Sequence, residues 1–201
     1  MPFYMIESLY ENSNSSYSIY EGNPGQDNAS PFFVRRQAYW SILSGSTGHI
    51  YGSKMWSIPS NWKDYLNLPG ANDLTHLANL FSNIEWYNLV PDFDHHLFTA
   101  GYGKYESSDY VAAALSSDKN LGVAYLPSTC TGTRTLTVNM SNLKAEANCK
   151  WFNPNTGEYL KIGRYDNKGS RNFTTSGSNE ENANDCVQIL DSRRGKVSTT
   201  P

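Results

Sequence analysis

The side chains of this 201-residue sequence that could do chemistry gather at the ends of two short apolar runs. Glu7 directly follows the first run, residues 1–6, and Glu11 comes four residues after Glu7. A carboxylate in such a position can act as a nucleophile or as a general acid or base. His49 lies in the second run, residues 48–52. Its imidazole is either a hydrogen-bonded core group or a partner for Glu7 or for a ligand.

Other combinations of residues do not indicate metal, redox or serine chemistry. His95 and His96 are adjacent, so their side chains are poorly placed to share a metal ion, and no third ligand lies nearby in the sequence. The three cysteines, at 130, 149 and 186, lack the Cys-x-x-Cys spacing of zinc and redox sites. No Gly-x-Ser-x-Gly elbow is present. We therefore expect no metal and no cofactor.

Two predicted strands carry the candidate residues. Residues 2–7 are apolar without alternation, which predicts a strand buried on both faces that ends at Glu7. Residues 48–51 are bounded by glycines and predict a second strand. A helix is predicted between them, and a strand, a helix and a strand in this order require a parallel pair. The N-terminal half is therefore expected to be α/β.

The helix between these strands is predicted over residues 31–44. Pro31 is typical of a first helical residue, and Gly45 is typical of a helix end. Arg35 and Arg36 are adjacent on this helix, so we expect at most one to face inward and favour solvent exposure for them. Periodic apolar residues predict a second helix over residues 73–85.

Beyond about residue 95 the pattern changes to short strands separated by turn residues. Strands are predicted over residues 111–115, 122–126, 133–138, 148–152, 158–162 and 185–190. Several short strands at regular spacing are typical of an antiparallel β-sandwich. The fold class is thus α/β plus all-β, with domains at residues 1–98 and 99–191 and a tail at 192–201.

Composition excludes two classes of partner. Lys and Arg number 16 against 19 Asp and Glu, without the basic surplus that binding to nucleic acid requires. No run of about 18 apolar residues is present, so no membrane-spanning helix is expected. Aromatic residues make up 13% of the chain, and their burial favours a folded protein. We expect no nucleic acid and no membrane among the partners.

One long stretch and several later motifs resemble a known family. The stretch is Arg35–Gly52, which includes Arg-Arg-Gln-Ala-Tyr-Trp and His-Ile-Tyr-Gly, and it is followed by Leu68-Pro69-Gly70-Ala71. These residues resemble the apiosidase-like glycoside hydrolases. The later motifs, Val123–Pro127, Trp151–Glu158 and Asn184–Leu190, are similar to the small β-module of collagen-binding type that follows the catalytic domain of that family.

The resemblance implies a fold and a missing part. Residues 1–98 would form the last two βα units of a (β/α)8 barrel, and residues 99–191 a small antiparallel β-sandwich. A barrel of this type needs about 250 residues. The first six strands therefore have no counterpart here, and we expect the chain to be a fragment or a truncated product.

The resemblance also implies roles for the candidate residues. Glu7 would be the nucleophile of a retaining glycosidase, whose acid/base residue would follow an earlier, absent strand. His49 would bond a sugar hydroxyl or orient Glu7. Tyr51 and Trp56 would either stack on sugar rings or pack the loop. Glu11 is the rival carboxylate, which would bind substrate or else be a solvated or arginine-paired loop residue.

We therefore predict the C-terminal part of a retaining glycoside hydrolase acting on complex polysaccharide, inactive as an isolated chain. The alternative is a non-catalytic carbohydrate- or collagen-binding β-module protein, and a third hypothesis is a β-module that only braces the barrel. Expected partners are a polysaccharide or oligosaccharide substrate, and the missing barrel segment or another chain. The resemblance implies an extracellular or periplasmic location, although no signal peptide is found in this chain.

Overall fold

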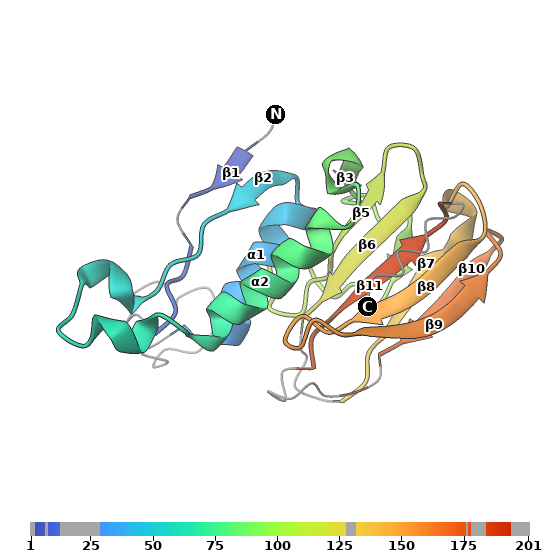
Figure 1. Cartoon of the computed structure of the whole chain (residues 1–201). Coiled ribbons are helices and arrows are strands. Elements are labelled where there is room, and N and C mark those ends of the chain that lie inside the picture. Colours follow the sequence, from blue (N-terminus) through green and yellow to red (C-terminus); the bar gives the residue numbers. More distant parts are fainter. Residues whose placement is uncertain are drawn as a thin grey trace.

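The computed structural model describes residues 3–6, 8–12, 29–127, 132–175, 177 and 184–193. It is a mixed α/β structure, made mostly of sheets, with two α-helices in its middle (Figure 1). The elements in chain order are β1 (Phe3–Met5), α1 (Pro31–Leu43), β2 (Ser46–His49), η2 (Lys54–Ser57), η3 (Trp62–Tyr65), α2 (Pro69–Ser82), η4 (Trp86–Asn88), β3 (Leu89–Pro91), β4 (Phe98–Ala100), β5 (Ala112–Ser116), β6 (Leu121–Leu126), β7 (Thr135–Asn139), η5 (Met140–Asn142), β8 (Ala147–Phe152), β9 (Tyr159–Tyr165), β10 (Ser170–Thr174) and β11 (Cys186–Asp191).

The predicted parallel pair is confirmed. β1 and β2 form a two-stranded parallel sheet in which Met5 is the register partner of His49. The expected burial of the first strand is wrong, because the side chains of Phe3, Tyr4 and Ile6 are 44%, 47% and 69% exposed. β2 is the only strand that pairs with β1 in the described part of the chain, so one strand edge and much of the apolar surface of β1 face solvent.

The two helices occur where the sequence predicts them, with one shifted start. Helix α1 begins at Pro31 and ends at Leu43, and Gly45 just beyond it has a φ of +97°. Helix α2 begins at Pro69, four residues before the predicted start, because a proline at the first helical position begins the helix ahead of its apolar periodicity. Within the described ranges, neither helix combines the length and hydropathy needed to cross a membrane.

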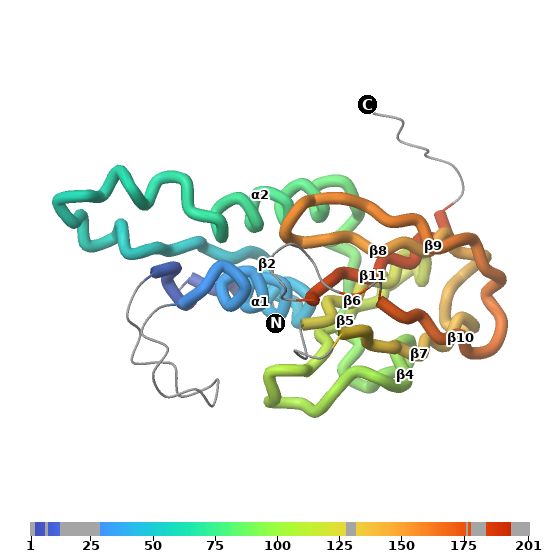
Figure 2. The backbone as a smooth tube through the Cα atoms, turned by 90° about the horizontal axis from the view of Figure 1, so that it is seen from below, coloured from blue at the N-terminus to red at the C-terminus, as the bar shows by residue number. Residues whose placement is uncertain are grey.

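Two antiparallel sheets make up the C-terminal half. Figure 2 labels their strands on the backbone, seen from below. The larger sheet has the strand order β3-β5-β6-β11-β8-β9, and the smaller one has the order β10-β7-β4. All six predicted strands are present, whereas β3, β4 and β10 were not expected. β3 and β4 have only three residues each, and four of the five residues of β10 are exposed, so no apolar pattern marks them. The edge strand β3 precedes the predicted boundary at residue 98.

Two apolar cores stabilise this arrangement, one on each face of the six-stranded sheet. The inner core lies between the two antiparallel sheets and includes Phe98, Leu126, Leu136 and Trp151. The outer core lies between the six-stranded sheet and the helices α1 and α2. In it, the rings of Tyr39 on α1 and Tyr125 on β6 stack with their centroids 4.6 Å apart. Helices and sheet therefore share one core.

A buried arginine connects the helices to the sheet. Arg35 on α1 donates two hydrogen bonds of 2.8 Å to Asp185, which precedes β11, and one of 2.7 Å to Asp73 on α2. The three side chains are at most 2% exposed. Burial raises the pKa of Tyr125, whose hydroxyl remains protonated and donates to Asp185. Although burial alone lowers the pKa of Arg35, its bonds to Asp185 and the nearby charges hold that pKa above its ordinary value.

The expectation that Arg35 and Arg36 lie on a solvated helix face is wrong. Both are buried because α1 is covered on more than one side, by α2, by β2 and by the six-stranded sheet. The guanidinium of Arg36 lies over the rings of Phe32, Phe33 and Trp40 at 4.7 to 5.1 Å. Cation–π contacts and aromatic packing thus replace solvation of its charge.

We expect Arg35→Met to destabilise the fold by about 3–5 kcal/mol, because it leaves the carboxylates of Asp73 and Asp185 buried without their cation. Urea denaturation of the whole chain measures this change. Arg164→Ala is the matched control, since Arg164 pairs with Glu146 at the surface and its removal is expected to cost less than about 1 kcal/mol. Equal losses for the two variants would contradict the assignment.

Gln188 places a polar side chain within the apolar inner core. Its side chain is fully buried on β11 opposite Ala124 and Trp151, and neither amide atom has a hydrogen-bond partner among the described residues. Gln188→Met keeps the volume and removes the unsatisfied amide, so we expect it to raise the free energy of unfolding by about 1–3 kcal/mol. Gln188→Ala, which leaves a void, should gain less. A lower urea midpoint for Gln188→Met would refute this prediction.

Candidate functional site

The predicted site residues that the structure describes lie at or beyond the C-terminal ends of β1 and β2. Glu7, two residues after β1 in the sequence, lies outside the described residues. His49 ends β2, Tyr51 follows it, and Trp56 is part of η2. Parallel pairing places the C-terminal ends of both strands at the same edge. The structure therefore brings His49 and Tyr51 to the edge at which β1 ends.

His49 is a neutral group with unused hydrogen-bonding capacity. Both of its ring nitrogens are buried, and neither has a partner among the described residues. Burial lowers the pKa of His49 below its ordinary value, because it disfavours the charged form of the imidazole. A neutral imidazole has one donor and one acceptor. It is suited to a hydroxyl group, which can accept and donate in turn.

Glu11 is neither solvated nor paired with an arginine. Its side chain is fully buried, the Tyr51 hydroxyl donates to its Oε2 at 2.7 Å, and the Gly70 N–H donates to its Oε1 at 3.1 Å. Burial and the bond to Glu11 raise the pKa of Tyr51, so this hydroxyl stays protonated as a donor. A Cβ atom at position 70 would collide with Oε2 of Glu11, which explains the glycine there.

Trp56 lies further out and is 67% exposed. The ring of Tyr10 meets it edge to face, with the ring centroids 6.3 Å apart. A largely exposed tryptophan beside a second aromatic ring offers a flat apolar surface to a ligand. Trp62, six residues later, is also partly exposed, and the sequence reasoning missed it although it lies in the same loop.

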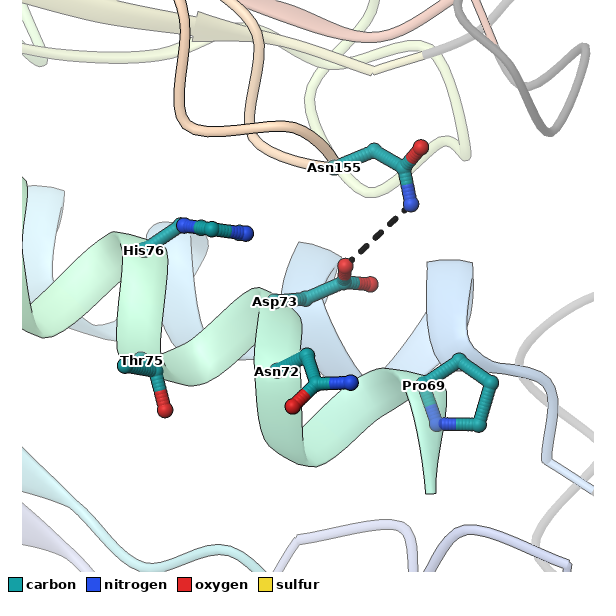
Figure 3. Close-up of a pocket in the computed structure, with 6 residues that line it drawn as sticks. All are labelled: Pro69, Asn72, Asp73, Thr75, His76 and Asn155. Atoms are coloured by element: carbon teal, nitrogen blue, oxygen red, sulfur yellow. Dashed lines mark hydrogen bonds between the residues drawn. The ribbon is translucent and has the colours of Figure 1, made fainter. Parts of the chain in front are cut away.

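A shallow groove of about 300 Å³ lies elsewhere, between α2 and the turn that joins β8 to β9 (Figure 3). Its lining consists of Pro69, Asn72, Asp73, Thr75, His76 and Asn155. None of the predicted site residues in the described part of the chain lines it. The Asp73 carboxylate is already bonded to Arg35, and it also accepts a bond of 3.3 Å from the Asn155 amide. The groove is thus part of the junction between helix and β-module.

No metal site comes together within the described ranges, where no three His, Cys, Asp or Glu side chains are clustered. The polar groups that the structure does assemble are a carboxylate, a phenol and a neutral imidazole. Groups of these types form hydrogen bonds with hydroxyl groups, and the exposed ring of Trp56 adds an apolar face.

We expect the free energy of unfolding to decrease as the pH falls, and we expect part of this decrease to depend on His49. Because its pKa is lowered in the folded state, the unfolded chain takes up a proton near pH 6.5 while the folded chain does not. The contribution of neutral His49 to the free energy of unfolding is complete above pH 6.5. It is lost as the pH falls toward the lowered pKa of the folded state. Urea denaturation between pH 7 and pH 5 should therefore show a smaller loss for His49→Asn than for the wild type. Parallel losses would contradict it.

Two family models match the chain, one over each half. The model described as "Apiosidase-like, catalytic domain" matches residues 1–88, and the model described as "Putative collagen-binding domain of a collagenase" matches residues 94–191. The resemblance found in the sequence is thus confirmed. A search of curated proteins returned no match.

Solved structures of glycoside hydrolases share the fold. One described as "Glycoside hydrolase" is 25% identical, with a TM-score of 0.78, and the match covers 96% of this chain and 43% of that one. A glycoside hydrolase family 5 structure from Bacteroides vulgatus is 23% identical, with a TM-score of 0.76, and the match covers 95% of this chain and 42% of that one. The chain therefore has a glycoside-hydrolase-like fold and spans less than half the length of these structures.

Proposed function

We propose that this chain, which joins an apiosidase-like segment to a segment of collagen-binding type, is the C-terminal part of a retaining glycoside hydrolase that acts on complex polysaccharide. The observation that carries the proposal is the parallel pairing of β1 and β2, with Met5 opposite His49. In barrel enzymes, catalytic groups follow the C-terminal ends of parallel strands. Glu7 follows β1 in the sequence, and the match to the catalytic-domain model includes it.

The proposed architecture is a partial (β/α)8 barrel followed by a β-sandwich. The sequence β1-α1-β2-α2 supplies two βα units, and the two antiparallel sheets with their common core supply the sandwich. Eight βα units need about 250 residues. We infer that six further units, from a preceding segment or from another chain, complete the barrel by pairing with the outer edges of β1 and β2.

In the proposed reaction, the Glu7 carboxylate attacks the anomeric carbon and forms a covalent glycosyl-enzyme. A second carboxylate, about 5–5.5 Å away and supplied by the rest of the barrel, protonates the departing oxygen and then takes a proton from the water that releases the sugar. The two ring nitrogens of His49 are buried and have no partner among the described residues, so we assign His49 to orienting Glu7 from the adjoining strand. Tyr51 and Trp56 form the adjoining wall, and Glu11 contributes through its bond to Tyr51.

We assign a bracing role to the β-module. Its six-stranded sheet shares the outer core with α1 and α2, and Asp185 holds Arg35 across the same boundary. This contact favours mechanical support of the barrel helices over an independent ligand-binding role. Since polysaccharides of this complexity lie outside cells, we place the enzyme in the extracellular or periplasmic space, without membrane or nucleic-acid partners.

In the completed enzyme, Glu7→Gln should lower kcat by about 10⁴-fold or more, because the amide cannot form the glycosyl-enzyme. Turnover of aryl glycosides and plant polysaccharides measures this loss, and the thermal midpoint should remain near that of the wild type. Glu11→Gln is the control carboxylate variant, expected to keep the covalent step. Loss of turnover in Glu11→Gln alone would overturn the assignment of Glu7.

A further inference from the structure

Residues 52–69 form an arm that projects from the body of the protein beyond the end of β2, seen as the turquoise segment at the left of Figure 1. None of residues 54–67 is buried. The arm nevertheless carries five large apolar side chains that are at least 37% exposed: Met55, Trp56, Ile58, Trp62 and Leu66. Exposed apolar groups gathered in this way mark a binding surface.

The base of the arm is fixed by one buried residue. The Glu11 carboxylate accepts from the Tyr51 hydroxyl on one side of the base and from the Gly70 N–H on the other. The Glu11 N–H also donates to the carbonyl of Gly52, and its carbonyl accepts from Lys54, both at 2.9 Å. Both ends of the arm are therefore held at Glu11, which gives a preorganised shape.

The tip of the arm has a strained backbone. Ile58 is 78% exposed and has a φ of +46°, in the left-handed region that β-branched residues rarely adopt. It also precedes Pro59, which disfavours a helical conformation at the residue before it. Strain at exposed positions of this kind is typical of ligand-binding segments.

We propose that the arm is a sugar-binding platform, on which Trp56 and Trp62 stack against sugar rings, and that Glu11 is the positioning residue that holds this platform beside the ends of β1 and β2. The proposal rests on the proposed glycosidase function and defines where the polysaccharide continues beyond the reacting sugar. The arm starts directly after His49 and Tyr51, so it is continuous with the residues assigned to the catalytic site.

The chemistry of the arm favours a sugar over a protein. A sugar ring has apolar C–H faces and a rim of hydroxyl groups, so it needs a flat aromatic surface bordered by hydrogen-bonding groups. Polar groups lie next to Trp62: Asn61 donates to Asp64 at 3.1 Å, and the Lys63 ammonium lies over the Trp62 ring, 5.7 Å from its centroid. Charged groups like these are depleted at the centre of protein interfaces.

Native affinity electrophoresis of the 201-residue chain tests the platform, in gels that contain soluble xylan, xyloglucan or pectin. We expect retardation in at least one gel, and an affinity about three- to tenfold weaker for Trp56→Ala and for Trp62→Ala. Tyr87→Ala is the matched control, because Tyr87 is 72% exposed on η4 and should bind like the wild type. No retardation of the wild type in any of the three gels, or equal retardation of all variants, would overturn the proposal.

A second set of variants tests the positioning role of Glu11. Glu11→Ala should weaken affinity as much as the tryptophan variants do. Glu11→Gln should keep the affinity of the wild type, because its amide oxygen can accept from the Gly70 N–H and its amide nitrogen can donate to the Tyr51 hydroxyl oxygen. Tyr51→Phe removes only one of the two bonds and serves if Glu11→Ala fails to fold, as judged by circular dichroism. Full affinity in a folded Glu11→Ala or, failing that, in Tyr51→Phe refutes the role.

The outcomes separate this proposal from the proposed catalytic function. Binding is measured on the chain alone and needs no turnover, whereas Glu7→Gln is measured by turnover in the completed enzyme. If Glu7→Gln abolishes turnover while the tryptophan variants bind normally, only the platform fails. If the wild-type chain self-associates in size-exclusion chromatography and Trp56→Ala makes it monomeric without affecting retardation, the arm is a protein interface instead.

Discussion

The buried guanidinium of Arg35 is the contact on which the arrangement of the molecule depends. It joins three parts that are distant in sequence: its own helix α1, Asp73 on α2, and Asp185 at the start of β11. Loss of Arg35 would be costly, because each carboxylate would remain in a medium of low dielectric constant without a cation. Helices and sheet are therefore fixed in relative position by charge as well as by their common apolar core.

The parts of the fold that follow from local sequence could be predicted. The parallel pair depends on two apolar runs around one helix, and the hairpin between β5 and β6 depends on turn residues within five positions. The exposure of β1 could not be predicted, because burial depends on which neighbours a strand has and not on its own pattern. Polar strands such as β10 could not be predicted either, because only Phe173 among the residues of β10 is buried and no apolar pattern marks the strand.

The candidate site also has features that the sequence predicts and features that it does not. His49 and Tyr51 could be proposed from their place in the second predicted strand, and the structure places both at the edge where β1 ends. The role of Glu11 could not be predicted, since its partners Tyr51 and Gly70 lie 40 and 59 residues away along the chain. Arg35 and Asp185 are 150 residues apart, and nothing in the adjacent Arg35 and Arg36 tells that both are buried.

The first turns of α2 connect the two buried charge clusters. Leu68 precedes the helix, and its side chain cannot cap the first N–H groups. Glu11 takes the place of a cap by accepting from the Gly70 N–H. The helix dipole also favours a negative charge at this end. One turn further on, Asp73 binds Arg35 and the Asn155 amide from the turn after β8, as Figure 3 shows for Asn155. The same short stretch of α2 is thus held by the base of the arm on one side and by the β-module on the other. A shift of the β-module against α2 would move Gly70 and, through Glu11, the base of the arm. Bracing by the module thus reaches the proposed substrate platform from Asn155 and Asp73, along α2, to Gly70 and Glu11.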